Sequence, residues 1–343
     1  MAKTNTLAKT LDLPARLTDT ALARLAAQSP AAAYVRTMTT DSGRRTMAAA
    51  IATAADVLAP GSVPPATGKG RGGNAPERFA AACGLPWHQL TVARLGELRA
   101  ELLRAKFAPA TVNKVLAAVR GVLDQAWRQG LVDVETLERA KDSMGAVKAS
   151  TAVRGRHLSR MELARILAAC AKDRTLGGAR DGAAIALLAI GLRRAEVASV
   201  RLEDYERATG RLLVRGKGNK ERVVFLTNGS RDAVEAWLEC RGNAAGGLLS
   251  QVNRHGRIMG SGVTAQAVYS ALQRRAVSVG VPCTPHDLRR TFAGEALTAG
   301  VDVATVQAIM GHSSPATTAR YDRRPEETRR RAMEAVPIPY TRA

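Results

Sequence analysis

Apolar residues in the first part of the chain recur at the three- and four-residue spacing of amphipathic helices. A helix is expected from Ser29, because Ser can cap it and Pro30 then takes the first helical position, where a missing N–H costs nothing. The clearest later example has six apolar residues on one helical face: Val112, Val115, Leu116, Val119, Val122 and Leu123. We therefore predict a helical bundle over residues 26–140, preceded by a loosely ordered tail over residues 1–25.

The pattern becomes mixed in the second part of the chain. Residues 141–158 are polar and basic, which is typical of an interdomain linker. Ser159, followed by Glu162 three residues later, predicts a capped helix start. Two β-prone runs, 212–215 and 222–226, flank the sequence GKGNKE, and this arrangement predicts a hairpin. Helical patterns return after it.

Length and composition agree with this organisation. A chain of 343 residues favours about two domains. The apolar fraction is 46%, but aromatic residues make up only 3%, which favours helical packing of small and branched side chains over a large β-sandwich. The predicted fold class is mainly α with a small β-hairpin or sheet (α+β). A second, mostly helical domain is expected over residues 159–343.

The net charge of the chain gives the strongest indication of a binding partner. The chain holds 51 Lys and Arg against 30 Asp and Glu, a formal net charge of +21. The excess is not confined to a tail, since residues 1–150 hold 20 basic and 12 acidic side chains and residues 151–343 hold 31 and 18. A basic surplus in both domains is typical of a protein that grips a polyanion with both. A bland alternative is an Arg- and Ala-rich composition without any such partner.

Other function classes receive no support. The cysteines are far apart and form no CxxC pair, so neither a zinc site nor a redox motif is indicated: Cys83, Cys170, Cys240 and Cys283. No carboxylate cluster for Mg²⁺ is visible, and we expect neither a metal nor a cofactor. The N-terminus lacks an apolar signal region and no run of about 18 apolar residues occurs, so a cytoplasmic protein without a membrane partner is expected.

The candidate catalytic residues lie in the second domain. In TPHDLRRTF, Thr284 can cap a helix that begins at Pro285, which places His286 and Arg289 three residues apart on one face. In GLRRAE, Arg193 follows an apolar helix and needs a partner, which Glu196 could be. Each motif alone is equally compatible with an ordinary helix start or a solvated arginine.

Two further motifs complete the set. Lys217 lies in the hairpin turn GKGNKE, where a solvated lysine is the ordinary interpretation. Near the end of the chain, MGHSSPATTARY places His312 just after a helix stop at Gly311 and Tyr321 nine residues later, on a further helix. A lone tyrosine there would ordinarily be a packing residue.

Together these side chains could act on a phosphodiester. Two arginines offer planar forks that stay charged and can neutralise a crowded phosphate. A tyrosine attacks as a nucleophile if a base such as histidine takes its proton. A lysine can protonate the leaving 5′-oxygen.

The four motifs, in order and spacing, resemble the signature of the tyrosine recombinases, which include phage-type integrases and Xer recombinases. The resemblance implies that Tyr321 forms a 3′-phosphotyrosyl bond while Arg193 and Arg289 hold the phosphate. Lys217, or less favourably Lys220, would be the general acid. His286 and His312 would handle protons, and Glu196 would orient the site. No ATP or metal is implied. Residues 26–140 resemble a core-binding (SAM-like) domain that would form a clamp around DNA with the catalytic domain.

The resemblance also implies partners. These are double-stranded DNA with specific recombination sites and a homo-tetramer on paired sites, with the tail 325–343 packing on a neighbouring protomer. A free monomer or dimer, an accessory directionality factor and a nucleoid location are compatible with it. Two alternatives stay open, namely a tyrosine enzyme acting on one duplex, such as a type IB topoisomerase or hairpin resolvase, and a noncatalytic DNA-binding protein.

Overall fold

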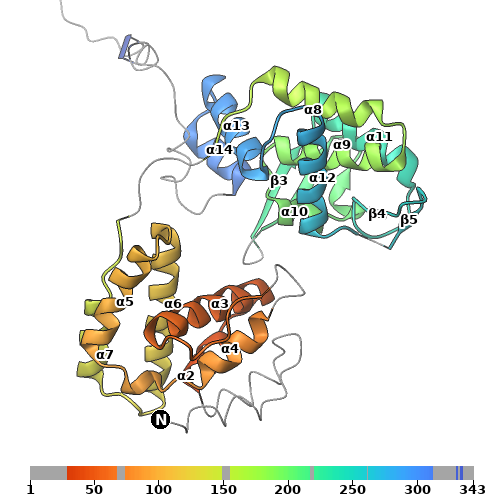
Figure 1. The fold of residues 1–343 in the computed structure, drawn as a ribbon. Helices are drawn as coiled ribbons and strands as arrows, with labels where there is room; N and C mark the ends of the chain where they lie inside the picture. The colour runs from red at the N-terminus through yellow and green to blue at the C-terminus, as the bar shows by residue number, and fades with distance from the viewer. Residues whose placement is uncertain are drawn as a thin grey trace, which may run out of the picture. The chain divides into compact units, whose positions relative to one another are not determined.

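A computed structural model describes residues 29–67, 74–148, 155–216, 220–260, 262–311, 330 and 333–334. The chain divides into two compact units, residues 1–152 and 153–343. Each is considered separately below (Figure 1). The fold is mainly α with small antiparallel sheets, which confirms the predicted fold class.

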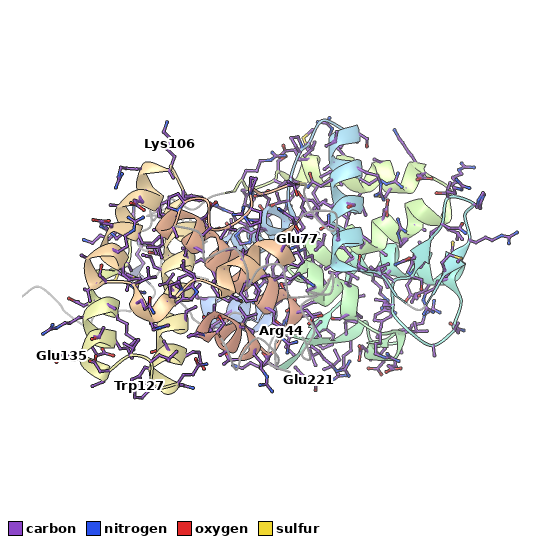
Figure 2. The ribbon with its side chains drawn as sticks, turned by 60° about the horizontal axis from the view of Figure 1, so that its bottom comes forward. Arg44, Glu77, Lys106, Trp127, Glu135 and Glu221 are labelled. Atoms are coloured by element: carbon purple, nitrogen blue, oxygen red, sulfur yellow. The ribbon has the colours of Figure 1, made fainter. Side chains whose placement is uncertain are left out.

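The first unit is a helical bundle. Its elements are α2 (Pro30–Arg36), α3 (Asp41–Leu58), α4 (Ala75–Cys83), the 3₁₀ turn η2 (Trp87–Gln89), α5 (Val92–Arg104), α6 (Pro109–Arg128) and α7 (Val134–Ser143). All six apolar residues that define the predicted face of α6 are buried, and they pack in one core with α2, α3 and α5. Trp87 closes this core and donates from its indole N–H to the carbonyl of Ala82 at 2.9 Å. Figure 2 shows Lys106 at one end of the bundle and Trp127 at the other.

The boundaries of this unit differ in detail from the sequence pattern. Residues 60–77 are rich in Pro and Gly, a composition typical of a loop. Helix α4 nevertheless begins within them, at Ala75, because Pro76 occupies an early helical position where proline is tolerated. Helix α7 continues to Ser143, inside the stretch with linker composition.

The second unit surrounds a buried helix. Its elements are α8 (Arg160–Lys172), α9 (Leu176–Ala189), α10 (Arg194–Ser199), the 3₁₀ turn η3 (Leu202–Asp204), β1 (Tyr205–Glu206), β2 (Arg211–Arg215), β3 (Glu221–Phe225), α11 (Asn228–Arg241), β4 (Gln251–Val252), β5 (Ile258–Met259), α12 (Ala265–Ser278), α13 (Pro285–Thr298) and α14 (Val303–Met310). Helix α9 is nearly all apolar, and α8, α11, α12 and α13 pack around it. It can therefore hold these helices in place from inside the core.

Two small antiparallel sheets complete the unit. Strands β1, β2 and β3 pair in that order, and β4 pairs with β5. The β2–β3 register places Leu212 opposite Val224 and Val214 opposite Arg222, so these four residues share the face directed towards the core. Glu221, at the start of β3, is exposed (Figure 2).

The described helices include none that is both long and apolar enough to cross a lipid bilayer.

Close packing between α2 and α6 gives a first test. Gly121 of α6 leaves no room for a side chain, since an added Cβ would overlap the Tyr34 ring. We expect Gly121→Ala to lower the free energy of unfolding by roughly 1 to 3 kcal/mol through overpacking. Chemical denaturation of the full-length protein, followed by circular dichroism, measures this.

The matched control is Gly96→Ala on α5. There the added Cβ would lie 3.6 Å from the Ser143 Cβ, an ordinary contact. The better helix propensity of Ala should make this variant neutral or more stable, by up to about 1 kcal/mol. Equal losses in both variants would contradict the tight approach of Tyr34 to α6.

Candidate active site

The C-terminal end of α14 is the place where the predicted site residues come together. Asp302 caps the start of this helix by accepting from the backbone N–H of Thr305 at 2.8 Å. Gly311 ends it in the left-handed conformation, with φ of 61°. A helix end leaves its last carbonyl groups without partners inside the helix. Here three arginines supply the missing donors.

Three consecutive carbonyl oxygens each accept from a different arginine. The Arg222 Nε donates to Ile309 at 2.7 Å, and the Arg193 Nη2 donates to Gly311 at 2.8 Å. Between these two, the carbonyl of Met310 accepts from Arg289. Since the C-terminal end of a helix carries partial negative charge, three cations there are favourable.

Glu196 joins two of these arginines. Its carboxylate accepts from the Arg193 backbone N–H at 2.8 Å and from the Arg193 Nη1 at 2.7 Å. It also accepts a two-pronged pair of hydrogen bonds from Arg222, at 3.0 and 2.8 Å. The Glu196 side chain is only 4% exposed, so the carboxylate is a buried charge with two cationic neighbours.

The titration of Glu196 reflects these neighbours. Burial raises the pKa of the carboxyl, but the hydrogen bonds from Arg222 and from the backbone of Arg193, together with the positive charge of Arg222, outweigh burial. The net result is a pKa below the ordinary value of 4.5. Glu196 is therefore ionised at neutral pH and can orient both guanidinium groups.

Arg289 reaches the same place from α13. The start of this helix is fixed by a capping box between Thr284 and Asp287, and it lies at Pro285 with Thr284 as its cap, as the sequence predicted. Arg289 itself is buried, and its guanidinium donates to the carbonyls of Gly191 and Met310. Gly191 has a φ of +92°, and a Cβ there would press on the Phe292 ring. Glycine is therefore required where α9 turns towards Arg193.

The opposite side of α13 accepts hydrogen bonds from the backbone near the start of the second unit. The Arg156 backbone N–H donates to Asp287 at 2.9 Å, and the Leu158 N–H donates to the Thr291 hydroxyl at 2.9 Å. Burial raises the pKa of Asp287, but the hydrogen bonds from Thr284 and Arg156 lower it by more than burial raises it. The net pKa therefore lies below its ordinary value. Asp287 therefore links the helix start to the incoming chain.

The structure brings together part of the predicted set. Arg193, Glu196 and Arg289 meet at the end of α14, and His286 lies exposed in the first turn of α13. Lys220 is exposed, and its carbonyl accepts from the Gly216 N–H at 2.8 Å, which closes the β2–β3 ladder. The other predicted residues, Lys217, His312 and Tyr321, lie outside the described residues.

Sequence reasoning missed Arg222. The signal was available, because Arg222 alternates with Val224 and Leu226 in a β-prone run and thus falls on the apolar face of the strand. An arginine on such a face requires a buried acceptor. Glu196 is that acceptor.

Comparisons with known proteins agree with this arrangement. Residues 156–327 match the phage integrase family. Tyrosine recombinase XerD of Lacticaseibacillus casei is 31% identical over 228 residues, 62% of this chain and 72% of that protein. The chain belongs to the phage integrase family of tyrosine recombinases. Such enzymes cleave and rejoin DNA strands in site-specific recombination, so the two alternatives, a single-duplex enzyme and a noncatalytic binder, are not favoured.

Two more similarities define the extent of the match. Tyrosine recombinase XerA of Thermococcus kodakarensis is 34% identical over 179 residues, 52% of this chain, and the match spans 61% of that protein. The crystal structure of a lambda integrase(75–356) dimer bound to a COC′ core site superposes with a TM-score of 0.54 at 15% identity. It covers 69% of this recombinase and 81% of the integrase chain, and it shows a shared fold.

The buried carboxylate gives a stability prediction. Glu196→Gln keeps the shape of the side chain but removes the countercharge from Arg193 and Arg222. We expect the free energy of unfolding to fall by roughly 3 to 5 kcal/mol, as when one partner of a buried ion pair is removed. Glu203→Gln is the control, since Glu203 pairs with Arg201 at the surface and should matter little.

The wild type and Glu196→Gln should also differ in how their stability depends on pH. Because the folded pKa of Glu196 is lowered, its contribution is present above the ordinary pKa of 4.5 and is lost as the pH falls through the folded pKa. Below about pH 4.5 the wild type should therefore lose stability more steeply than Glu196→Gln. Parallel curves in urea denaturation across this range would refute the assignment.

Proposed function

We propose that this recombinase cleaves DNA with Tyr321 while Arg193 and Arg289 hold the scissile phosphate. The observation that carries the proposal is the meeting of both guanidinium groups at the end of α14, immediately before His312 in sequence. Each guanidinium has five N–H donors in a fixed plane, which suits a phosphate with several oxygens. The carbonyl groups they bind here carry partial negative charge, as phosphate oxygens do.

The chemistry is a transesterification. The Tyr321 hydroxyl oxygen bonds to phosphorus, and the bond from phosphorus to the 5′-oxygen breaks. A histidine, His286 or His312, takes the tyrosine proton, and Lys217 or Lys220 gives a proton to the 5′-oxygen. Because the phosphotyrosyl ester conserves the phosphodiester bond, a free 5′-hydroxyl can attack it and rejoin the strands without ATP.

Each supporting group has a physical task. The two arginines stabilise the extra negative charge that develops on the phosphate oxygens in the transition state. Glu196 keeps Arg193 in one orientation through two hydrogen bonds. None of these steps assigns a role to a metal ion, and the described residues contain no group of His, Cys, Asp and Glu suited to bind one.

Double-stranded DNA is the proposed partner. A net charge of +21 supports electrostatic binding to phosphates, and the lambda integrase of similar fold was crystallised as a dimer on a core site. Residues 26–140 and 159–343 would each grip the duplex, forming a clamp. A tetramer on paired sites, joined through the tail 325–343, would act on nucleoid DNA in the cytoplasm, with an accessory factor setting direction.

The nucleophile assignment is tested by covalent trapping. In a duplex nicked just beyond the cleavage site, cleavage releases the short fragment that carries the free 5′-hydroxyl, so that rejoining cannot occur and the adduct accumulates. The duplex is obtained by selecting sites that the wild-type protein binds in a randomised pool. The wild type should form a protein–DNA adduct on a denaturing gel, and Tyr321→Phe, which lacks the hydroxyl, should form none. An adduct with Tyr321→Phe would refute the assignment.

The phosphate contact is tested by neighbouring arginines. Arg193→Ala should bind the selected duplex with little loss but cleave it about 10² to 10³-fold more slowly, the cost of one transition-state donor. Arg194→Ala is the control, because the Arg194 guanidinium lies 5.8 Å from the Tyr269 ring centroid and makes no hydrogen bond to Glu196, Arg289 or any other predicted site residue within the described part of the chain. If gel shifts show Arg193→Ala losing affinity in proportion to activity, the separation of binding from catalysis is wrong.

A further inference from the structure

We propose that Arg222 is a positioning residue of the recombinase site. It would act through Glu196 and the end of α14, and would not touch the DNA. The inference rests on the proposed function, because it assigns Arg222 to the alignment of Arg193, one of the proposed phosphate-binding residues, and of the end of α14. The evidence is the set of contacts that this one residue makes, through its backbone and its guanidinium, to three separate parts of the second unit.

The first contact is with the hairpin that carries the candidate general acids. Arg222 lies two residues after Lys220 on β3, opposite Val214 on β2. Its side chain shares the core-facing side with Val224 and is 12% exposed. An anchored guanidinium at this place holds the start of β3, which follows directly after Lys220.

The second contact is with Glu196. Both terminal nitrogens of Arg222 bind the carboxylate, at 3.0 and 2.8 Å. Such a planar, two-pronged pair fixes the angle of the carboxylate as well as its position. The same carboxylate binds the Nη1 of Arg193 at 2.7 Å. The orientation of Arg193 therefore depends on Arg222.

The third contact is with the end of α14. The Arg222 Nε donates to the carbonyl of Ile309 at 2.7 Å. The guanidinium also lies against Gly311, where an added Cβ would be 3.0 Å from Nη1 and 3.2 Å from Cζ. Glycine is thus needed at position 311 both for its left-handed backbone and for the close approach of Arg222.

Arg193 and Arg222 differ in whether they are accessible to a DNA phosphate. The side chain of Arg193 is 41% exposed and can turn part of its fork to a phosphate, exchanging the Gly311 carbonyl for it. Arg222 directs Nε, Nη1 and Nη2 to protein oxygens and is shielded. It can therefore keep the hairpin, Glu196 and α14 in register while Arg193 engages the substrate.

The control is an arginine one position along the neighbouring strand. Arg215 on β2 also binds a buried carboxylate, with its Nη1 2.6 Å from Asp204, and it also binds Glu221. Among the described residues, its hydrogen bonds connect to η3 and β3, away from α14. Arg222→Ala and Arg215→Ala therefore remove the same side chain from the same sheet, but only the first releases Glu196 and Ile309.

The experiment measures single-turnover cleavage of the selected nicked duplex by the full-length protein. We expect Arg222→Ala to bind the duplex with an affinity within about twofold of the wild type and to cleave it about 10- to 100-fold more slowly, the size of effect that a misplaced catalytic group produces. Arg215→Ala should cleave close to the wild-type rate. Millimolar guanidinium ion should restore part of the rate to Arg222→Ala and leave Arg215→Ala unchanged.

A second variant distinguishes the loss of positioning from misfolding. Arg222→Lys keeps a positive charge beside Glu196, but an ammonium on its flexible stem cannot hold the carboxylate in two-pronged fashion and also reach Ile309. It should fold, as judged by circular dichroism and thermal unfolding, and still cleave slowly. Cleavage by Arg222→Lys at the wild-type rate would overturn the positioning role.

The outcomes separate the two proposals. If the wild type forms no adduct with its selected duplex, the proposed function is wrong and the role of Arg222 falls with it. If the wild type reacts and Arg222→Ala cleaves as fast as Arg215→Ala, only the positioning role is wrong. Equal slowing of both variants, or the absence of guanidinium rescue in a folded Arg222→Ala, also rejects it.

Discussion

The pairing of the buried Glu196 carboxylate with two guanidinium groups is the interaction on which the second unit depends most. A charge removed from water costs several kcal/mol unless partners surround it, and here two guanidinium groups do so. Because one partner comes from the start of α10 and the other from β3, satisfying this single charge brings the two elements together. The packing of the hairpin against α10 thus has an electrostatic cause in addition to its apolar face.

The same two guanidinium groups also bind the end of α14, so the position of this helix end is linked to Glu196 as well. The unpaired carbonyls of a helix end need donors, and Arg193, Arg222 and Arg289 supply them at three successive residues. Groups that suit phosphate oxygens therefore bind protein carbonyl oxygens here. A site built in this way can hold its cations close together, since the helix end offsets their mutual repulsion.

Much of the fold follows from the sequence, because its signals are local. The apolar face of α6, the capping box at Ser159 and the hairpin all depend on residues a few positions apart. The pair Arg193 and Glu196 was predictable for the same reason. Strands of two residues, such as β4 and β5, carry no periodicity, so the helical interpretation of that region omitted them. The contacts of Arg222 with Ile309 and of Arg193 with Gly311 could not be predicted, because they join positions 87 and 118 residues apart.

Long-range contacts also explain why α13 can carry two of the candidate groups. On one side, Arg289 ties this helix to the turn after α9 and to α14. On the other, Asp287 and Thr291 accept from the backbone at Arg156 and Leu158, where the chain enters the unit. Backbone donors cannot be exchanged by changes of rotamer, so this second attachment is rigid. A displacement of the entering chain must therefore move α13 or break these bonds, and the geometry around Arg289 is coupled to the segment that leads into the unit.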